Sequence, residues 1–372
     1  MRSATKALCI ALAFLLLLAP LSACTKPSPP APVTPPEEVF EPAPPEEPAE
    51  DEIAESPNPI PEGPVNPLTG LADGLSEEAA ARRPAAVMIN NLKQAIPQLG
   101  ISKADIIYEM MAEGRIYRML AVFQDPSRVG RIGSVRSARP YFVDMAENHN
   151  AVFFHIGASV PGYEALRSRK NVLSFDGIVD GKAEIYYRDA ERKKKNGYEH
   201  SVLTTGERIE SVYAKQKPEK ISNSDAAPAF DFSAEHSALS GQNAAKIDVP
   251  YSGYIKVWFE YDQASGTYKR FQYEEAHMDA EYDVQLAFGN VFVLFMKARD
   301  VPGSELHLVE ITTTGSGTGY YACGGKAVEI KWSKKDHASP MIYTLADGTP
   351  LKVAPGKSFI CCAPTTTDVT IS

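Results

Sequence analysis

The sequence predicts an α/β (α+β) N-terminal domain with a mixed sheet, followed by a smaller, mostly antiparallel β C-terminal domain. Between residues 84 and 200, apolar runs typical of buried strands alternate with helical spacing. Beyond residue 250 the apolar pattern has a period of two, with turn residues between the runs. The roughly 306 residues after position 66 are also more than one small domain usually contains. We therefore place an α/β domain at 67–217, a connector at 218–249 and a β-rich domain at 250–372.

The first 23 residues have the features of a lipoprotein signal peptide. Arg2 and Lys6 form a short basic region. The apolar run from Ala7 to Ala19 is shorter than a typical transmembrane helix. The run ends in Leu-Ser-Ala-Cys, which resembles the bacterial lipobox, so we expect lipidation at Cys24. An uncleaved N-terminal anchor is the alternative. Either interpretation predicts a protein held to the cell membrane on its extracytoplasmic face.

Residues 24–66 are predicted to be an extended stalk. Of the 42 residues after Cys24, fourteen are proline and ten are acidic. Proline removes hydrogen-bond donors and the acids repel one another, so this segment cannot build a packed core. The stalk carries a charge of −9 and residues 67–372 only −2, so the acidity of the chain belongs to the stalk. The nearly neutral remainder argues against a nucleic-acid partner.

Strands and helices alternate in the predicted α/β domain. Ser102 and Gly114 suit the two ends of a helix, and Pro161 suits the start of another. In chain order we expect a strand at 85–91, a helix at 102–114, a strand at 117–124, a helix at 138–149, a strand at 151–158 and a helix at 162–169.

The predicted C-terminal domain consists of short strands. They are expected at 254–262, 267–275, 290–298, 305–313, 327–332 and 340–348. The glycine-rich segment 315–325 lies between two of these patterns and is predicted to be a loop. Cys361 and Cys362 must face opposite sides of a strand, so only one of them can pair with Cys323. A disulfide from Cys323 to either cysteine, or three free thiols, are the open alternatives.

Arginines are concentrated in the segment from 118 to 142. Its five arginines are accompanied by no lysine, and Asp125 is the only acid. Pro126, Gly130 and Gly133 indicate a loop, and the next helix is expected to begin around Ser137 to Pro140. Guanidinium groups beside the free N–H groups of a helix start favour phosphate or carboxylate. The candidate ligand-binding residues of this segment are Arg118, Arg131, Arg136, Ser137 and Arg139.

Salt bridges are the alternative explanation for these arginines. Glu109, Glu113 and Asp144 lie close enough in sequence to neutralise them. We also include Glu109 among the candidate ligand-binding residues. His155 joins them because it ends an apolar strand just before a glycine, near where α/β sheets place ligands. A strand histidine bonded to a backbone carbonyl is its other interpretation. No motif indicates a metal or cofactor.

Several segments of the sequence together resemble the YerB-like bacterial lipoproteins. "RPAAVMINN", "ADIIYE", "EGRIYRMLAVFQ", "RIGSVRSARPYF" and "HIGAS" are similar to the N-terminal domain of that family. "GTPLKVAPGKSFICCAP" and Trp332 are similar to its second domain. The resemblance covers nearly all of residues 66–372 and implies a two-domain extracytoplasmic lipoprotein. The family often has proline at the position of Ser134 and glycine at that of Arg115.

Together these features predict a membrane-anchored, non-catalytic binding module. The expected partners are the membrane, through Cys24, an anionic glycan or lipid-linked phosphate, and cell-wall proteins. Two other functions remain open. One is a phosphotransferase-like enzyme acting on polyprenyl-linked glycans, in which the arginines neutralise the transferring phosphoryl group. The other is a scaffold for cell-wall machinery.

Overall fold

The computed structural model describes residues 63–179, 184–224 and 228–372. The predicted signal peptide, Cys24 and most of the predicted stalk lie outside these residues. Residues Asn58–Ser372 form one compact unit. Within the described part, no helix is long and apolar enough to cross a membrane.

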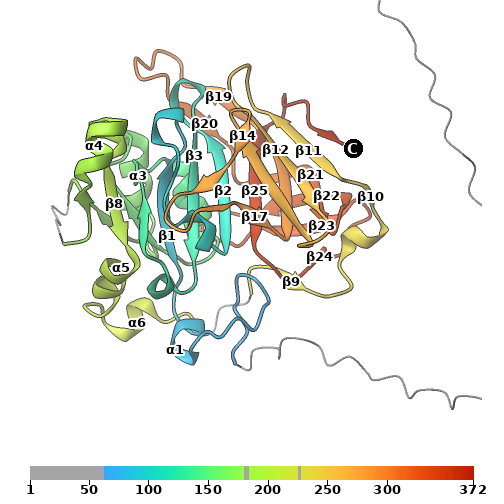
Figure 1. Cartoon of the computed structure of the whole chain (residues 1–372), viewed down its shortest axis with the longest axis horizontal. Helices are drawn as coiled ribbons and strands as arrows, with labels where there is room; N and C mark the ends of the chain where they lie inside the picture. Colours follow the sequence, from blue (N-terminus) through green and yellow to red (C-terminus); the bar gives the residue numbers. More distant parts are fainter. Residues whose placement is uncertain (1–62, 180–183, 225–227) are drawn as a thin grey trace, which may run out of the picture. The chain divides into compact units, whose positions relative to one another are not determined.

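An 11-stranded mixed sheet forms the centre of this unit (Figure 1). Its strand order is β10 (Gln242–Asn243), β22 (Lys326–Lys334), β21 (Gly315–Cys323), β18 (Asn290–Met296), β25 (Ser358–Pro364), β2 (Ile106–Met111), β3 (Tyr117–Phe123), β1 (Ala85–Asn90), β5 (Val152–His155) and β6 (Leu173–Asp176), while β23 (Ile342–Leu345) pairs with β22. The N-terminal strands pair in mixed directions and most C-terminal strands are antiparallel, which confirms the predicted fold class.

The two halves of the chain meet inside this sheet. β25, near the C-terminus, pairs in parallel with β2 from Ile106 opposite Ser358 to Met110 opposite Cys362. On its other side β25 pairs in parallel with β18. Figure 1 shows β25, in red, beside β2, in cyan. Backbone hydrogen bonds therefore run without a break from the strands of the first half to those of the second.

A second sheet covers one face of the large sheet. Its order is β14 (Glu275–Ala276), β13 (Thr267–Gln272), β12 (Lys256–Asp262), β11 (Lys246–Pro250) and β26 (Thr370–Ile371), with β17 (Ala287–Phe288) also paired to β13. Phe259 and Phe288 pack against Phe359 of β25, with ring centroids 5.3 and 5.1 Å apart. On the same side a small sheet of β4 (Arg131–Gly133), β8 (Val202–Thr205) and β7 (Tyr187–Arg188), together with helix α5 (Gly206–Tyr213), packs over the first-half strands.

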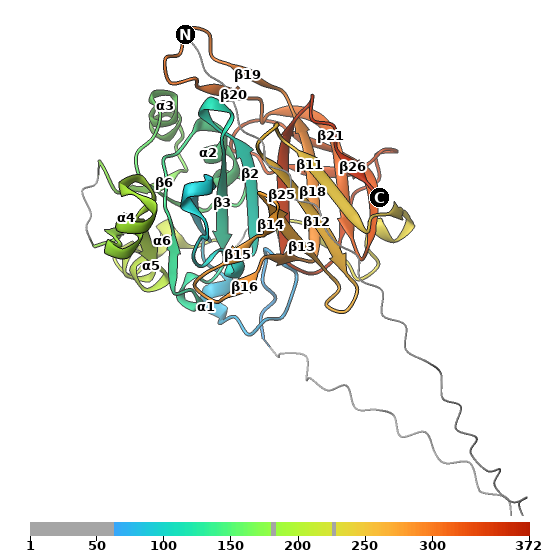
Figure 2. The same cartoon turned by 45° about the horizontal axis from the view of Figure 1, so that its top comes forward.

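Helices cover the opposite face of the first-half strands (Figure 2). α2 (Pro140–Glu147) and α3 (Val160–Ser168) pack on each other, and α2 contacts β3 and β5. The remaining helices are α1 (Glu77–Ala80), α4 (Ala190–Asn196), α6 (Pro218–Ile221) and the 3-10 turns η1 (Lys93–Ala95), η2 (Ile101–Lys103), η3 (Glu113–Arg115), η4 (Pro126–Arg128), η5 (Tyr198–His200) and η6 (Ser237–Ser240). The remaining strands are β9 (Asp231–Phe232) with β24 (Lys352–Val353), β15 (Met278–Asp279) with β16 (Val284–Gln285), and β19 (Ala298–Asp300) with β20 (Val309–Ile311).

Most predicted elements are present with shorter bounds. The expected strands at 85–91, 117–124 and 151–158 are β1, β3 and β5, and the expected helices at 138–149 and 162–169 are α2 and α3. Five of the six expected C-terminal strands contain β12, β13, β18, β20 and β23, and the sixth, at 327–332, lies within the longer β22.

The predicted helix at 102–114 is wrong, because its centre is the strand β2. Ile107 faces the core under the second sheet, while Tyr108 faces the core on the helix-covered side. A strand that is buried on both faces has a continuous apolar run, which sequence spacing cannot distinguish from a buried helix.

The predicted glycine-rich loop at 315–325 is also wrong, because most of it is strand β21. Two glycines inside the strand leave room for close neighbours, while Gly324 and Gly325 form the turn to β22. A Cβ at Gly317 would lie 2.6 Å from the indole nitrogen of Trp332, and one at Gly319 would lie 2.2 Å from the carbonyl oxygen of Val293.

All three cysteines of the described chain are free thiols, so the disulfide alternative is wrong. Cys361 and Cys362 do face opposite cores, as predicted. Cys323 lies on β21, which is separated from β25 by β18. Two strand spacings are about 9.5 Å, well beyond the reach of a disulfide.

A fully buried ion pair joins the two sheets. Arg270 of β13 donates to both carboxylate oxygens of Glu109 on β2, at 2.9 and 3.0 Å, and both side chains are fully buried. Asn91 Nδ2 also donates to Glu109, at 2.6 Å. Arg270 further bonds to Gln272 and to the Nδ1 atom of His277. Burial and the neighbouring Arg270 hold the pKa of His277 well below its ordinary value, so its ring is neutral.

Removing Arg270 should therefore destabilise the fold strongly. In Arg270→Ala the carboxylate of Glu109 remains buried without its cation, and we expect a loss of about 3–5 kcal/mol in the free energy of unfolding. Urea denaturation of residues 58–372 measures it. Arg299→Ala is the matched control, because the Arg299–Glu310 pair is exposed and should be worth less than about 1 kcal/mol. Equal, small losses in both variants would contradict the assigned role of the buried pair.

Candidate functional site: an arginine cluster at the carboxyl ends of two parallel strands

The segment from Ser134 to Arg139 lies between the carboxyl ends of β1 and β5, which run parallel to each other. The backbone N–H of Arg136 donates to Met88 of β1 at 3.0 Å, and its carbonyl accepts from Ile156, just after β5, at 3.1 Å. Arg139 is then the N-cap of α2 and Pro140 its first residue, as expected. The carboxyl ends of parallel strands are where open α/β sheets hold ligands.

Arg118 and Arg139 share one carboxylate at this position. Arg118, on β3, donates from Nη2 to Glu113 and from Nη1 to the carbonyl of Ser137, the latter at 2.8 Å. Arg139 binds the same carboxylate from Nε at 2.9 Å and from Nη2 at 2.6 Å. Both arginines are buried, and Glu113 lies in the turn η3 between β2 and β3.

The charges of this cluster are not balanced. Burial, and then repulsion by Arg139, lower the pKa of Arg118 to about 9. Burial alone would raise the pKa of Glu113, but Arg118 and Arg139 outweigh it and hold that pKa below its ordinary value. Arg136 adds a third positive charge beside them, because it directly precedes Ser137, whose carbonyl accepts from Arg118. We call Arg118, Arg136 and Arg139 the arginine cluster.

Arg136 is the most accessible member of the arginine cluster. It is half-buried, and its contacts to Glu199, to the carbonyl and to Oε2, are both long, at 3.4 Å. Beside it, His200 Nδ1 and Asn90 Nδ2 lie 2.8 Å apart. Burial and the positive charge of Arg136 lower the pKa of His200, so this ring is neutral at neutral pH.

Several donors in and beside the arginine cluster have no partner among the residues that the structure describes. They are Nε of Arg118, Nε of Arg136 and the hydroxyl of Tyr141, on α2. Burial raises the pKa of Tyr141 above its ordinary value, so the hydroxyl keeps its proton. Unused donors beside excess positive charge are suited to an anion.

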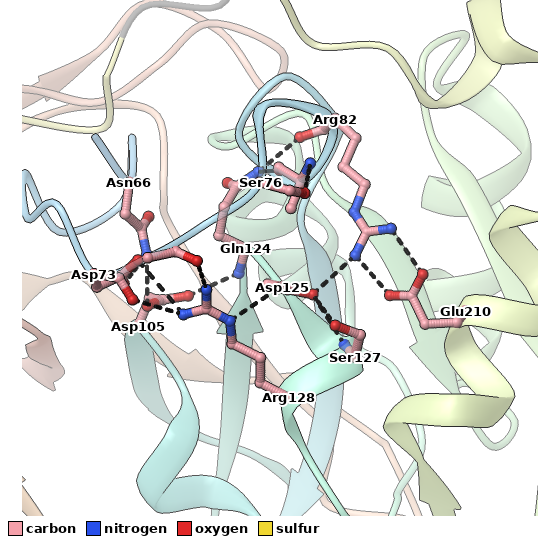
Figure 3. Close-up of polar contacts among 12 residues, drawn as sticks. Asn66, Asp73, Ser76, Arg82, Asp105, Gln124, Asp125, Ser127, Arg128 and Glu210 are labelled. Carbon is pink, nitrogen blue, oxygen red and sulfur yellow. Dashed lines mark hydrogen bonds and ion pairs between the residues drawn. The ribbon is translucent and has the colours of Figure 1, made fainter. Parts of the chain in front are cut away.

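Other arginines of the segment are engaged elsewhere. Arg131 pairs with Glu281 at 2.7 Å, and exposed Arg115 lies 3.5 Å from Asp300. Arg128 contacts Asp73 and Asp125 and belongs to a separate network (Figure 3). The structure thus brings Arg118, Arg136, Ser137 and Arg139 together and places Arg131 against another partner.

Figure 3 shows the network around Arg128. Asp125 also pairs with Arg82, which binds Glu210 of α5 through two hydrogen bonds of 2.7 and 2.6 Å. Asp105 nearby accepts from the backbone of Gln124 and from the side chain of Asn66. Burial raises the pKa of Asp105 to about 6. These hydrogen bonds and ion pairs hold the residues that precede β1 against the large sheet.

Two predicted site residues are buried away from solvent. Glu109 belongs to the ion pair with Arg270, so its role in the structure is to join the two sheets. His155, the last residue of β5, is fully buried, and its Nδ1 lies 2.9 Å from the carbonyl of Gly157, in agreement with the backbone-bonded interpretation. The salt-bridge alternative is correct for Glu113, whereas Asp144 pairs with Arg169 instead.

Sequence reasoning missed three neighbours of the cluster: Asn90, Tyr141 and Glu199. Asn90 ends β1, which places it beside the cluster only once β1 and β5 are paired. Glu199 is 63 residues from Arg136, and no local pattern indicates their contact. Among the described residues there is no group of three or more His, Cys, Asp or Glu side chains that could hold a metal ion.

Comparison with known families also divides the chain into two halves. The "Protein of unknown function (DUF3048) N-terminal domain" matches residues 68–220, and the corresponding C-terminal domain matches residues 247–360. The chain therefore belongs to the DUF3048 family, the family of the YerB-like lipoproteins.

Two Bacillus subtilis comparisons support this assignment. The "Putative lipoprotein YerB" of strain 168 is 28% identical over 302 residues, which are 80% of this chain and 86% of that protein. The crystal structure of YerB protein superposes with a TM-score of 0.69 and 26% identity, covering 82% of this chain and 98% of the other. The chain is thus a homologue of a protein named as a lipoprotein.

Glu113 should stabilise the arginine cluster far more than Glu199 does. In Glu113→Ala, Arg118 and Arg139 lose their shared carboxylate, and we expect a loss of about 3 kcal/mol or more in the free energy of unfolding. Glu199→Ala removes only an exposed carboxylate with long contacts, so its effect should stay below about 1 kcal/mol. Urea denaturation at pH 7 compares the two. Equal effects would show that Glu113 does not hold the cluster.

Proposed function

We propose that this protein is a membrane-anchored extracytoplasmic lipoprotein that binds an anionic ligand of the cell envelope without converting it. Its ligand is a phosphate-bearing or carboxylate-bearing glycan or lipid-linked phosphate. The binding site is the arginine cluster, and Arg136 is the member of the cluster that is most accessible to the ligand.

The observation that carries the proposal is the charge imbalance of the cluster. The guanidinium groups of Arg118 and Arg139 share the one carboxylate of Glu113, and the pKa of buried Arg118 is already lowered to about 9. Arg136 beside them has only long contacts of 3.4 Å to the exposed Glu199. An arriving anion would relieve this repulsion. It would also use guanidinium donors in the planar, forked arrangement that suits phosphate and carboxylate oxygens.

The position of the cluster gives a second argument. The loop between the ends of β1 and β5 leads directly into α2, whose N-cap, Arg139, makes no side-chain capping hydrogen bond. The first residue of α2, Pro140, has no N–H, and the N–H of Phe142 donates to the carbonyl of Arg139, but the helix dipole still favours negative charge in the same space as the arginines. Charged side chains and backbone therefore act in the same direction.

The lipoprotein part of the proposal rests on the sequence and on the relative. The lipobox-like Leu-Ser-Ala-Cys ends in Cys24, and the similar Bacillus subtilis protein is named as a lipoprotein. Acyl chains on Cys24 would hold the protein at the outer surface of the cytoplasmic membrane, where anionic envelope polymers and lipid-linked phosphates occur.

Calorimetric titration with inorganic pyrophosphate tests the site directly. Residues 58–372 should bind pyrophosphate, and Arg136→Ala should weaken binding by roughly tenfold to a hundredfold, as expected for the loss of one charge-assisted contact. Arg299→Ala, at an exposed arginine paired with Glu310 on another hairpin, is the control and should bind as the unmodified protein does.

The proposal fails if neither pyrophosphate nor an anionic wall polymer binds, or if the two variants bind equally well. Magnesium-dependent turnover of a polyprenyl-linked substrate, lost in Arg136→Ala, would instead indicate the phosphotransferase function.

A further inference from the structure

Beside the arginine cluster, exposed apolar side chains gather on one surface. Val160, Ile178, Val179 and Tyr198 are 70, 64, 69 and 58% exposed. They are four of the eleven large hydrophobic residues that are exposed in the described chain. Single exposed apolar residues are ordinary, but a group of them beside charged residues indicates an interaction surface.

Backbone and side-chain contacts place these residues around Arg136. A Cβ added at Gly157 would lie 2.9 Å from the side chain of Ile178 and 3.6 Å from Ser137 Oγ, so Ile178 lies next to the start of the cluster. Val160 follows three residues after Gly157, at the first position of α3. On the other side, Glu199 contacts Arg136, and Tyr198 precedes it in η5.

The same surface carries exposed basic residues from β7 and α4. The guanidinium of Arg188 lies 3.5 Å from the ring centroid of Tyr198, and the Lys193 ammonium lies 5.5 Å from it. Lys194 and Lys195 are exposed as well, and the three lysines form no ion pair within the described residues. Figures 1 and 2 both show α3 and α4 at the first-half end of the large sheet.

We propose that this surface, which we call the α4 face, docks onto an anionic lipid bilayer. The α4 face consists of Val160, Ile178, Val179, Arg188, Lys193 and Tyr198. Val160, Ile178 and Val179 enter the boundary between headgroups and acyl chains. Tyr198 lies at the headgroup level, and the basic residues contact lipid phosphates.

The mixture of side chains is the reason to choose a bilayer. A hydrophilic wall polymer would use the lysines but leave three aliphatic side chains in water. A bilayer uses both kinds at once, because apolar burial and attraction to anionic lipids add together. The predicted lipid on Cys24 would also keep the folded unit close to such a surface, which raises the effective concentration for a weak contact.

Co-sedimentation with vesicles tests the inference. Residues 58–372, which form one compact unit and lack the predicted anchor, should bind phosphatidylglycerol vesicles and bind phosphatidylcholine vesicles at least tenfold more weakly. Ile178→Ser combined with Tyr198→Ser should reduce the binding to phosphatidylglycerol at least fivefold. Leu306→Ser combined with Tyr254→Ser, which removes apolar groups elsewhere that are even more exposed, is the matched control and should leave it unchanged.

The absence of binding to phosphatidylglycerol, or equal binding by both double variants, would overturn the inference. Binding to a soluble anionic wall polymer without binding to vesicles would overturn it too, in favour of a polymer surface. Pyrophosphate titration separates this result from the proposed function, because the variant at Ile178 and Tyr198 should keep the affinity of the arginine cluster. Circular dichroism confirms that each variant is folded.

Discussion

The parallel pairing of β2 with β25 is the constraint on which the rest of the structure depends. It joins strands from the two halves of the chain into one sheet, although about 250 residues separate Ile106 from Ser358. On the other side of β2, β3 pairs with β2, β1 pairs with β3, and β5 pairs with β1. The carboxyl ends of β1 and β5, where the arginine cluster lies, are therefore positioned by a strand from the far end of the chain.

β2 also organises the buried charges. Its Glu109 faces the second sheet and is bound by Arg270, while Glu113, in the turn that follows, is bound by Arg118 and Arg139. The first carboxylate is fully enclosed and neutralised one to one, so it fastens sheets together. The second is partly exposed and has two arginines, with a third beside it. A difference in burial and in the number of cations thus separates a structural ion pair from a candidate binding site.

The sequence was sufficient for the local features and not for the long-range ones. Apolar runs predicted β1, β3 and β5, and a period of two predicted most C-terminal strands. The proline at 140 predicted the start of α2. β2 was misassigned because both of its faces are buried, and β21 because its glycines accommodate Trp332 and Val293. The sequence indicated the arginine cluster, but it did not indicate that Arg131 pairs with Glu281 or that Glu109 pairs with Arg270.

Hydrogen exchange under increasing urea tests most directly whether one shared sheet positions the site. If β2 and β25 join the halves as described, the slowest-exchanging amides of β1 and β3 and those of β18 and β21 should open together, with one free energy and one urea dependence. Protection that persists in β18 and β21 at urea concentrations where β1 and β3 have already exchanged would contradict the account. It would show that the arginine cluster belongs to a domain that folds without the C-terminal strands.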